Sequence, residues 1–320
     1  MKKTFTLLAG AAMLLSSTFF QTARAQSADT AVTEYHVSSS FHEPADAGLR
    51  YIYSKDGIHW DSIPGTWLAP ELGDKIMRDP SIWRGPDGTY HLVWTIAWKH
   101  DTGIGYACSK DLIHWSEQKR IPVMDKVKST YSVWAPELFY DDVKQQYLIV
   151  YTAQVNDGTC TGRRNENGDY HRMYYVTTRD FNTFSEPRLF YDAGYSCIDG
   201  IIVKRGTNDY VLVAKDNRKA NSNLRVAFAK QAEGPYSIPL SQPFTSIFAE
   251  GPSVSKVGDT YYIYYDLYRR FTYGASMTKD FIHFTEATGL VEFPKDHKHG
   301  TTFKAPASIV EALLKASTAH

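Results

Sequence analysis

The chain has 320 residues, 43% of them apolar and 14% aromatic, so it can bury a large hydrophobic core. Its 35 basic and 35 acidic residues cancel, which argues against nucleic acid or an anionic membrane as partner and favours a neutral one. The many Tyr, Phe and Trp residues suit β-strands, and they suit sugars, whose CH-rich faces pack on aromatic rings.

Residues 1–25 have the pattern of an export signal. Two lysines precede the apolar run 7–15, and small residues at 23–25 provide a cleavage position. The apolar run is too short to span a bilayer, which disfavours a membrane anchor. We therefore predict an exported protein, periplasmic or secreted, with a disordered lead at 26–33 and a single domain at 34–320.

The three cysteines, Cys108, Cys160 and Cys197, do not have the spacing of a metal-ligand cluster. Their odd number permits one disulfide at most in an oxidising compartment. A Cys160–Cys197 bridge would brace the loop beside Asp199, and three unpaired buried thiols are the alternative.

From Tyr35 onward the chain consists of short apolar runs separated by turns, and 306–314 is the first amphipathic segment of helical length. This pattern predicts an all-β protein. A polar residue beside Gly or Pro opens an apolar run at five positions: Asp79, Glu137, Asp199, Glu250 and His299. The steps between them, from 49 to 62 residues, are typical of four-stranded units arranged radially.

A second recurring motif marks the outer edge of the units. It consists of Ser or Thr, a base, Asp and, a few residues later, an aromatic side chain, and it starts at Ser54, Ser109, Thr178 and Thr278. We expect its Asp to cap backbone donors of a turn, and its aromatic residue to fill the gap between sheets. Because these aspartates recur from unit to unit, we interpret them as structural.

The order of the two phrases predicts how the ring closes. The first outer-edge motif, at Ser54, precedes all five polar strand starts, whereas the last strand start, at His299, is not followed by an outer-edge motif. Pairing the N-terminal strands with the C-terminal strand completes a fifth blade and leaves no open sheet edge at the junction. We therefore predict a five-bladed β-propeller, with the long insert 156–171 as a loop at its mouth or rim.

In such a ring the inner strands start at one end of the channel, which would gather Asp79, Asp199 and Glu250. Crowded buried carboxylates repel one another, so one can keep its proton near neutral pH while another stays ionised. Glycoside hydrolysis needs this division of labour. Capping of the strand-start turns is the structural alternative, but three carboxylates at matched positions favour function.

Five motifs follow one another in order: Arg78-Asp79-Pro80, Trp134-Ala135-Pro136-Glu137, Ile198-Asp199-Gly200, Ala249-Glu250-Gly251-Pro252 and His299-Gly300-Thr301. Together they resemble the five-bladed propellers of glycoside hydrolase family 43, over 35–303. Members of that family are typically inverting glycosidases acting on arabinose-, xylose- or galactose-containing plant polysaccharides and oligosaccharides. The resemblance implies that Asp79 is the general base and Glu250 the general acid, with Asp199 raising the pKa of Glu250 and orienting it.

Other residues are candidates for substrate contacts. His299 matches a family histidine on the channel floor, beside a bound ion or water in some members; a packed histidine is the alternative. We interpret Glu137 as a contact to a sugar hydroxyl or to the catalytic residues. Glu233 mimics the Glu250 motif, but it ends a blade, so we place it on the rim and reject it as the acid.

Trp98 and Trp134 are candidate sugar platforms, with packing between sheets as the alternative. Arg269 and Arg270 follow the Glu250 blade's strands at the mouth, where a cation can bind sugar hydroxyls or steady a carboxylate; a solvated rim is the alternative. No metal or cofactor is required, although an ion near His299 is compatible with the resemblance.

The leading function is an exo-acting inverting glycosidase on plant-type polysaccharide or oligosaccharide side chains, with an α-L-arabinofuranosidase first. A β-galactofuranosidase, a β-xylosidase and a non-catalytic sugar-binding propeller are the alternatives. A retaining fructosidase is disfavoured because its Trp-Met-Asn-Asp-Pro-Asn signature is absent, and a phosphorylase because no clustered basic phosphate site is recognisable. The sequence indicates neither the sugar and linkage nor the oligomeric state.

Overall fold

The computed structural model describes residue 1 and residues 33–159, 162–218, 220–238 and 240–318. The predicted export signal, apart from residue 1, and the predicted lead, apart from residue 33, lie outside these residues. The compact unit begins at Val32. Among the described residues, no helix is both long enough and apolar enough to cross a membrane.

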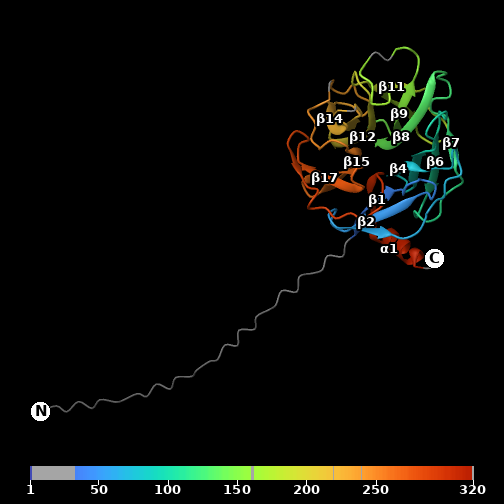
Figure 1. Cartoon of the computed structure of the whole chain (residues 1–320). Coiled ribbons are helices and arrows are strands. Elements are labelled where there is room, and N and C mark those ends of the chain that lie inside the picture. The colour runs from blue at the N-terminus through green and yellow to red at the C-terminus, as the bar shows by residue number, and fades with distance from the viewer. Residues whose placement is uncertain (2–32, 160–161, 219, 239, 319–320) are drawn as a thin grey trace. The chain divides into compact units, whose positions relative to one another are not determined.

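Five antiparallel sheets surround a common centre (Figure 1). The first blade contains β4 (Arg78–Arg84), β5 (Tyr90–Thr95), β6 (Ile104–Ser109) and β7 (Lys119–Ile121). The second contains β8 (Thr130–Asp141), β9 (Gln146–Val155), β10 (His171–Thr178) and β11 (Arg188–Tyr191). The third contains β12 (Cys197–Gly206), β13 (Asp209–Asp216) and β14 (Asn223–Ala229). The fourth contains β15 (Glu250–Val257), β16 (Thr260–Leu267), β17 (Thr272–Thr278) and β18 (Phe284–Glu286).

The fifth blade joins the two ends of the compact unit, as predicted. It contains β19 (Thr302–Pro306), β1 (Glu34–Ser40), β2 (Arg50–Ser54) and β3 (Trp60–Ile63). β1 pairs antiparallel with β19 from Glu34 opposite Pro306 to Ser38 opposite Thr302. The five-bladed all-β propeller predicted from the sequence is therefore confirmed. The one helix among the described residues, α1 (Ala307–Ser317), follows β19 where the amphipathic segment predicted it.

The hydrophobic core lies between blades. Five clusters of buried side chains each join two neighbouring sheets, so the apolar faces of every blade are covered by the blades beside it. Trp94 and Tyr51, for example, belong to the cluster between the first and fifth blades. This packing leaves the polar starts of the inner strands free to face the central channel.

The outer-edge phrase forms the capped turn that we predicted. In each turn one carboxylate oxygen of the Asp accepts hydrogen bonds of 2.8 to 2.9 Å from the backbone N–H groups two and three residues later in the chain. The four aspartates are Asp56, Asp111, Asp180 and Asp280. One detail differs from the prediction. In three of the four turns the residue directly after the Asp, Leu112, Phe181 or Phe281, is buried and fills the space between sheets. In the first turn that residue is Gly57, and the buried side chain is that of the terminal aromatic, Trp60.

The inner strands β4, β8, β12 and β15 share a bulge near their starts. The pairing register skips after Arg78, Trp134, Ile198 and Glu250. The next residue has a left-handed backbone in each case, with φ of 51° at Asp79, 46° at Ala135, 54° at Asp199 and 54° at Gly251. The prediction that the three carboxylates occupy matched positions is therefore wrong: Asp79 and Asp199 match, but Glu250 lies one residue earlier in its strand.

The bulge explains this difference. A bulge re-aims the side chains within it and beside it, so a carboxylate can reach the channel from the left-handed residue itself, as in Asp79 and Asp199, or from the residue before it, as in Glu250. Asp tolerates this conformation better than most residues, and Gly tolerates it freely. Glu250 comes before the bulge and has the longer side chain, which lets it enter the same space as the two aspartates.

Candidate active site

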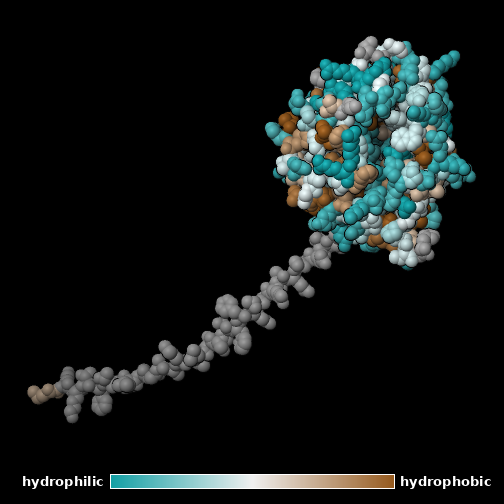
Figure 2. Space-filling model, in the orientation of Figure 1, coloured by the Kyte–Doolittle hydropathy of each residue, from teal (hydrophilic) through white to brown (hydrophobic). Residues whose placement is uncertain are grey.

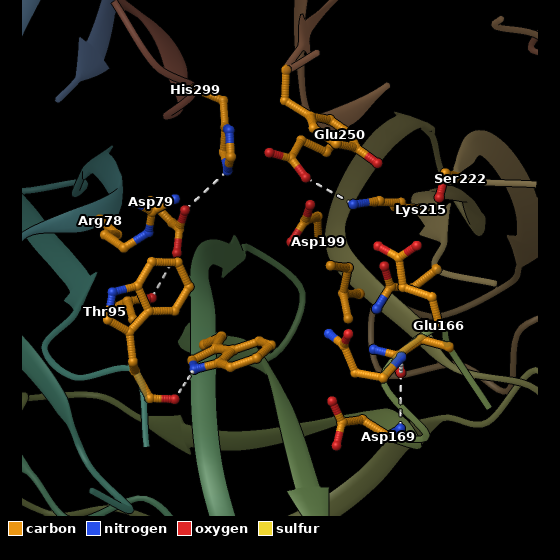
Figure 3. Close-up of a pocket in the computed structure, with 17 residues that line it drawn as sticks. Arg78, Asp79, Thr95, Glu166, Asp169, Asp199, Lys215, Ser222, Glu250 and His299 are labelled. Carbon is orange, nitrogen blue, oxygen red and sulfur yellow. Dashed lines mark hydrogen bonds and ion pairs between the residues drawn. The ribbon is translucent and has the colours of Figure 1, made fainter. Parts of the chain in front are cut away.

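A cavity of about 260 Å³ opens at the end of the propeller where the inner strands start. All five blades contribute to its lining, and Figure 3 shows the carboxyl groups of Asp79, Asp199 and Glu250 directed into it. The outer surface of the compact unit is mostly hydrophilic in the view of Figure 2. A smaller space of about 30 Å³ adjoins the cavity and shares Asp79, Asp199 and His299 with it.

Asp79 is held as an ionised carboxylate. Its Oδ1 lies 2.9 Å from His299 Nε2, and its Oδ2 accepts a hydrogen bond of 2.7 Å from the Thr95 hydroxyl. Burial of the carboxyl opposes ionisation, but the hydrogen bond and charge of His299, with help from Arg78 and Thr95, lower the pKa of Asp79 to about 2. Asp79 can therefore accept a proton at neutral pH.

His299 is buried between two carboxylates, as the floor of the cavity. Asp79 faces Nε2, and Asp266 Oδ2 lies 3.6 Å from Nδ1. Burial works against the charged ring, but the two aspartates outweigh it and hold the pKa of His299 well above its usual range. A ring nitrogen of His299 also lies within 4.8 Å of a Glu250 oxygen, so the imidazole is close to both Asp79 and Glu250.

Asp199 faces the backbone next to Glu250. Its Oδ2 accepts the N–H of Gly251 at 3.1 Å. Burial raises the pKa of Asp199 to about 6. The positive charges of His299 and Lys215 lower this pKa, and repulsion by Glu250 and Asp79 raises it. The group of carboxylates thus contains one with a raised pKa, Asp199, and one with a lowered pKa, Asp79. The assignment of the transferable proton to Glu250, made from the sequence, stays a prediction.

Glu250 makes a contact that the sequence did not suggest. Its Oε2 accepts a hydrogen bond of 2.7 Å from Lys215 Nζ, and the Lys215 side chain is only 5% exposed (Figure 3). Lys215 is the last residue but one of β13 and lies opposite Ile198, the residue before the bulge of β12. A lysine at the end of the apolar run Val211-Leu212-Val213-Ala214 was the signal that sequence reasoning missed.

The same register position is polar in other blades. Thr95 ends β5 opposite Arg78, and Asp266 in β16 lies opposite Glu250. The second strand of a blade therefore delivers a polar side chain to the cavity beside the bulge. Because the first strand carries the recognisable motif, these partners can be found only once the strand pairing is known.

A cation site is geometrically available but electrostatically poor. Among the described residues, Glu250, Asp266 and His299 place ligand atoms within 4.8 Å of one another. Lys215 already pairs with Glu250, and Lys298 Nζ lies 3.1 Å from Asp266 Oδ2. A cation there would face two ammonium groups at close range. The residues do not fit a metal-dependent step, and the ion considered near His299 stays a prediction.

Trp98 and Trp134 both line the cavity, as predicted for sugar platforms. Trp98 is 48% exposed, and the Arg78 guanidinium lies 4.2 Å from the centre of its ring. The Trp134 indole donates a hydrogen bond of 2.9 Å to the Trp98 carbonyl and stacks on His171. The two indoles therefore form one fixed aromatic wall, and their contact with sugar stays a prediction.

The long insert forms the opposite wall. Asn165, Glu166, Asn167 and Asp169 line the cavity, which agrees with the prediction of a loop at the mouth. Asn165 Oδ1 accepts backbone N–H groups of Asn167 and Asp169 at 2.9 and 2.8 Å, which shapes the turn. Sequence reasoning placed the loop but singled out none of these side chains.

Several candidates lie elsewhere. Arg269 and Arg270 are exposed and do not line the cavity; the Arg269 guanidinium lies 3.7 Å from the centre of the Phe248 ring, and Tyr268 lines the cavity instead. Glu137 lines the smaller space that adjoins the cavity, where its Oε2 accepts a hydrogen bond of 2.8 Å from Thr301.

Glu233 and the cysteines complete the comparison with the sequence predictions. Glu233 pairs with Lys144 at 2.6 Å and with Gln146 at 2.9 Å, and it does not line the cavity. Its rejection as the acid therefore agrees with its position. Cys197 has a free and buried thiol, while Cys160, its candidate disulfide partner, lies outside the described residues.

A five-bladed propeller with a carboxylate-lined pocket on its axis has the architecture of a glycosidase. Residues 32–307 match the model of a family described as "probable glycosyl hydrolase domain", which is related to glycoside hydrolase family 43. The chain belongs to this family.

Relatives agree with this assignment. An α-L-arabinofuranosidase from Bifidobacterium longum subsp. longum is 36% identical over 78 residues, which is 23% of this chain and only 7% of that protein. A thermostable family-43 glycoside hydrolase superposes with a TM-score of 0.54 at 16% identity, over 73% of this chain and 81% of the other. A xylan β-1,4-xylosidase from Bacillus halodurans C-125 gives 0.54 at 18% identity, over 74% and 47%. At these identities the structural likeness shows the fold.

Proposed function

We propose that this protein is an exo-acting, inverting glycosidase in which Asp79 is the general base, Glu250 is the general acid and Asp199 orients Glu250. The observation that carries the proposal is that Asp79 and Glu250 enter one pocket on either side of the His299 imidazole. An inverting enzyme needs a base and an acid far enough apart to admit water, about 6.5 to 9.5 Å between carboxyl groups.

The reaction then proceeds by one displacement. Asp79 takes a proton from water as the water oxygen attacks the anomeric carbon, and Glu250 gives its proton to the leaving glycosidic oxygen. The bond between the anomeric carbon and that oxygen breaks with its electron pair on the oxygen. Asp199 holds the Gly251 N–H and so fixes the backbone on which Glu250 is carried. No cofactor is required, and activity is expected to survive treatment with EDTA.

We propose an α-L-arabinofuranoside as the first substrate to test, on the side chains of a plant-type polysaccharide or oligosaccharide. The local similarity to an arabinofuranosidase supports this choice. The exo action is supported by the size of the cavity, because a volume of about 260 Å³ suits the end of a sugar chain better than a long stretch of it. Export to the periplasm or medium follows from the pattern of residues 1–25.

The test uses 4-nitrophenyl α-L-arabinofuranoside, β-D-galactofuranoside and β-D-xyloside. Wild type is expected to hydrolyse the first best, and proton NMR of the first-formed sugar should show the anomeric configuration opposite to that of the substrate. Glu250→Gln and Asp79→Asn should each lose about 10² to 10⁴ in kcat/KM. Glu233→Gln is the matched control, because it carries the same local motif outside the pocket, and it should keep full activity.

Two outcomes would change the proposal. A first-formed sugar with retained configuration would reject inversion. Equal activity of wild type and Glu250→Gln on every glycoside would favour the second candidate, a sugar-binding propeller without turnover. The presence of Asp79, Asp199 and Glu250 together in the pocket argues against that candidate.

A further inference from the structure

Lys215 is a charged side chain of the pocket to which the proposed reaction so far gives no role. It is almost fully buried, it donates to Glu250 Oε2 at 2.7 Å, and its ammonium lies 4.7 Å from the centre of the Tyr268 ring. A buried ammonium is costly unless a carboxylate compensates for it. Its presence beside the proposed acid therefore needs a reason.

The reason lies in the change of charge during proton transfer. An ammonium interacts weakly with a neutral carboxyl group and strongly with a carboxylate, because the charge-assisted hydrogen bond gains in strength as its acceptor becomes ionised. Glu250 changes from the first form to the second as its proton moves to the leaving oxygen. The Lys215 contact is thus stronger in the transition state than in the ground state, and such interactions accelerate a reaction.

The contact also leaves one oxygen free for the reaction. Lys215 occupies Oε2, so the transferable proton belongs on Oε1. A single fixed donor on one oxygen also limits rotation of the carboxyl group, and this keeps the acid pointed at one place.

We propose that Lys215 is a positioning residue for the general acid: it binds Oε2 of Glu250, leaves Oε1 to carry the proton, and stabilises the carboxylate that forms when the glycosidic oxygen takes that proton. This inference rests on the proposed role of Glu250. Atoms and charge balance, since the proton goes from Glu250 to the leaving group and a second proton goes from water to Asp79.

Other charges around Glu250 act in known directions. Asp199 and Asp266 repel its carboxylate form, whereas His299 attracts it, and Lys298 neutralises Asp266. Burial lowers the proton affinity of the Lys215 amine, but Glu250 and Asp199 outweigh burial and raise its pKa, so the ammonium persists throughout the working range. Loss of this charge should make Glu250 a weaker acid and move the alkaline limb of the pH profile upward.

The experiment compares Lys215→Met and Lys215→Arg on a series of aryl arabinofuranosides with leaving phenols of increasing pKa. In Lys215→Met we expect kcat/KM to fall about 100-fold for the poorest leaving groups and much less for 2,4-dinitrophenol, which departs without a proton. The alkaline limb should move up by about one pH unit. Lys215→Arg should recover most of both effects, because it restores the cation.

Lys144→Met is the matched control. Lys144 forms the equivalent pair with Glu233, at 2.6 Å, outside the pocket, so its removal should leave activity and pH profile unchanged. Thermal unfolding of all variants reports on folding, and Lys215→Gln replaces Lys215→Met if the latter does not fold.

The outcomes separate the two proposals. A uniform loss across leaving groups with an unmoved pH profile would show that Lys215 only supports the structure, and would overturn the inference while Glu250→Gln still discriminates between leaving groups. If Glu250→Gln itself shows no dependence on the leaving group, the proposed role of Glu250 fails, and the inference fails with it.

Discussion

At the scale of single residues, environment separates carboxyl groups that look alike in the sequence. Asp79 and Asp199 occupy the same backbone position, yet the pKa of one is lowered to about 2 and that of the other is raised to about 6. The difference arises from neighbours: His299 and Thr95 bind Asp79 directly, whereas Asp199 accepts a hydrogen bond from a backbone N–H. The motif places the carboxylates, and the neighbours that the fold brings to each of them determine its charge.

Glu137 gives the clearest test of burial. It lies below the pocket with a hydrogen bond from Thr301, and burial, only partly offset by Thr301 and Ser81, raises its pKa from 4.5 to about 7. Between pH 4.5 and about 7 the folded protein keeps this proton and the unfolded protein loses it, so the carboxyl lowers the free energy of unfolding progressively as pH rises through that range. Below 4.5 both states hold the proton and the cost is absent.

We therefore expect Glu137→Gln to unfold like wild type at about pH 4 and to be more stable than wild type at about pH 8, by about 2 to 3 kcal/mol. Urea unfolding at the two pH values measures the difference. Glu186→Gln is the control, since Glu186 pairs with Lys126 on the surface and should show no such gain. A Glu137→Gln variant that follows wild type at both pH values would mean that the carboxyl is better solvated than its surroundings indicate.

At the scale of elements, the repeated bulge is the device that forms the site. It puts a left-handed residue at the start of four inner strands, and only one of these residues, Gly251, is a glycine. The reason is contact: a Cβ at Gly251 would lie 2.0 Å from Cγ of His299. The position next to the proposed acid must stay bare so that the imidazole can reach Asp79.

Gly251→Ala should accordingly displace His299 and reduce kcat/KM by at least about 100-fold, with a loss of stability of about 2 kcal/mol or more. Gly258→Ala is the matched control. Gly258 has nearly the same left-handed backbone, with φ of 58° against 54°, but a Cβ added there would meet nothing within 4 Å. It should cost about 1 kcal/mol and leave kcat/KM unchanged. Similar effects of the two substitutions on activity would show that backbone strain, not the collision, matters.

The sequence predicted the features that depend on recurring motifs and missed those that depend on strand pairing. Two recurring phrases were enough for the blades, the ring closure and the pocket carboxylates, because each phrase is a local turn with its own chemistry. Lys215 and Asp266 were missed because a strand's partner residue depends on register, and the bulge shifts that register. Arg269 was predicted at the pocket because it follows the strands of the Glu250 blade, but its side chain lies over the Phe248 ring outside the pocket.

At the scale of the whole molecule, the net charge is zero, but acidic and basic residues are separated along the axis of the channel. The inner strands begin with acids at the pocket and mostly finish with bases: Arg84, Arg205, Lys256 and Lys304 line the wider space at the other end of the channel. Opposite charges at the two ends keep the carboxylates far from the main group of cations. Arg78, Lys215, Lys298 and His299 are cations at the pocket end, and each of them is paired with a carboxylate.

The ring itself depends on β19. This strand supplies the inner edge of the fifth blade, and His299 just before it forms the pocket floor, whereas α1 packs outside through Val310 and Leu313. A chain that ends at residue 306 loses two buried aliphatic side chains and should keep cooperative urea unfolding, with stability reduced by about 3 kcal/mol. A chain that ends at residue 300 leaves β1 unpaired on its inner side, and we expect it to lose the cooperative transition and all hydrolysis. Equal unfolding midpoints for the two truncations would mean that the other four blades hold the ring without its closing strand.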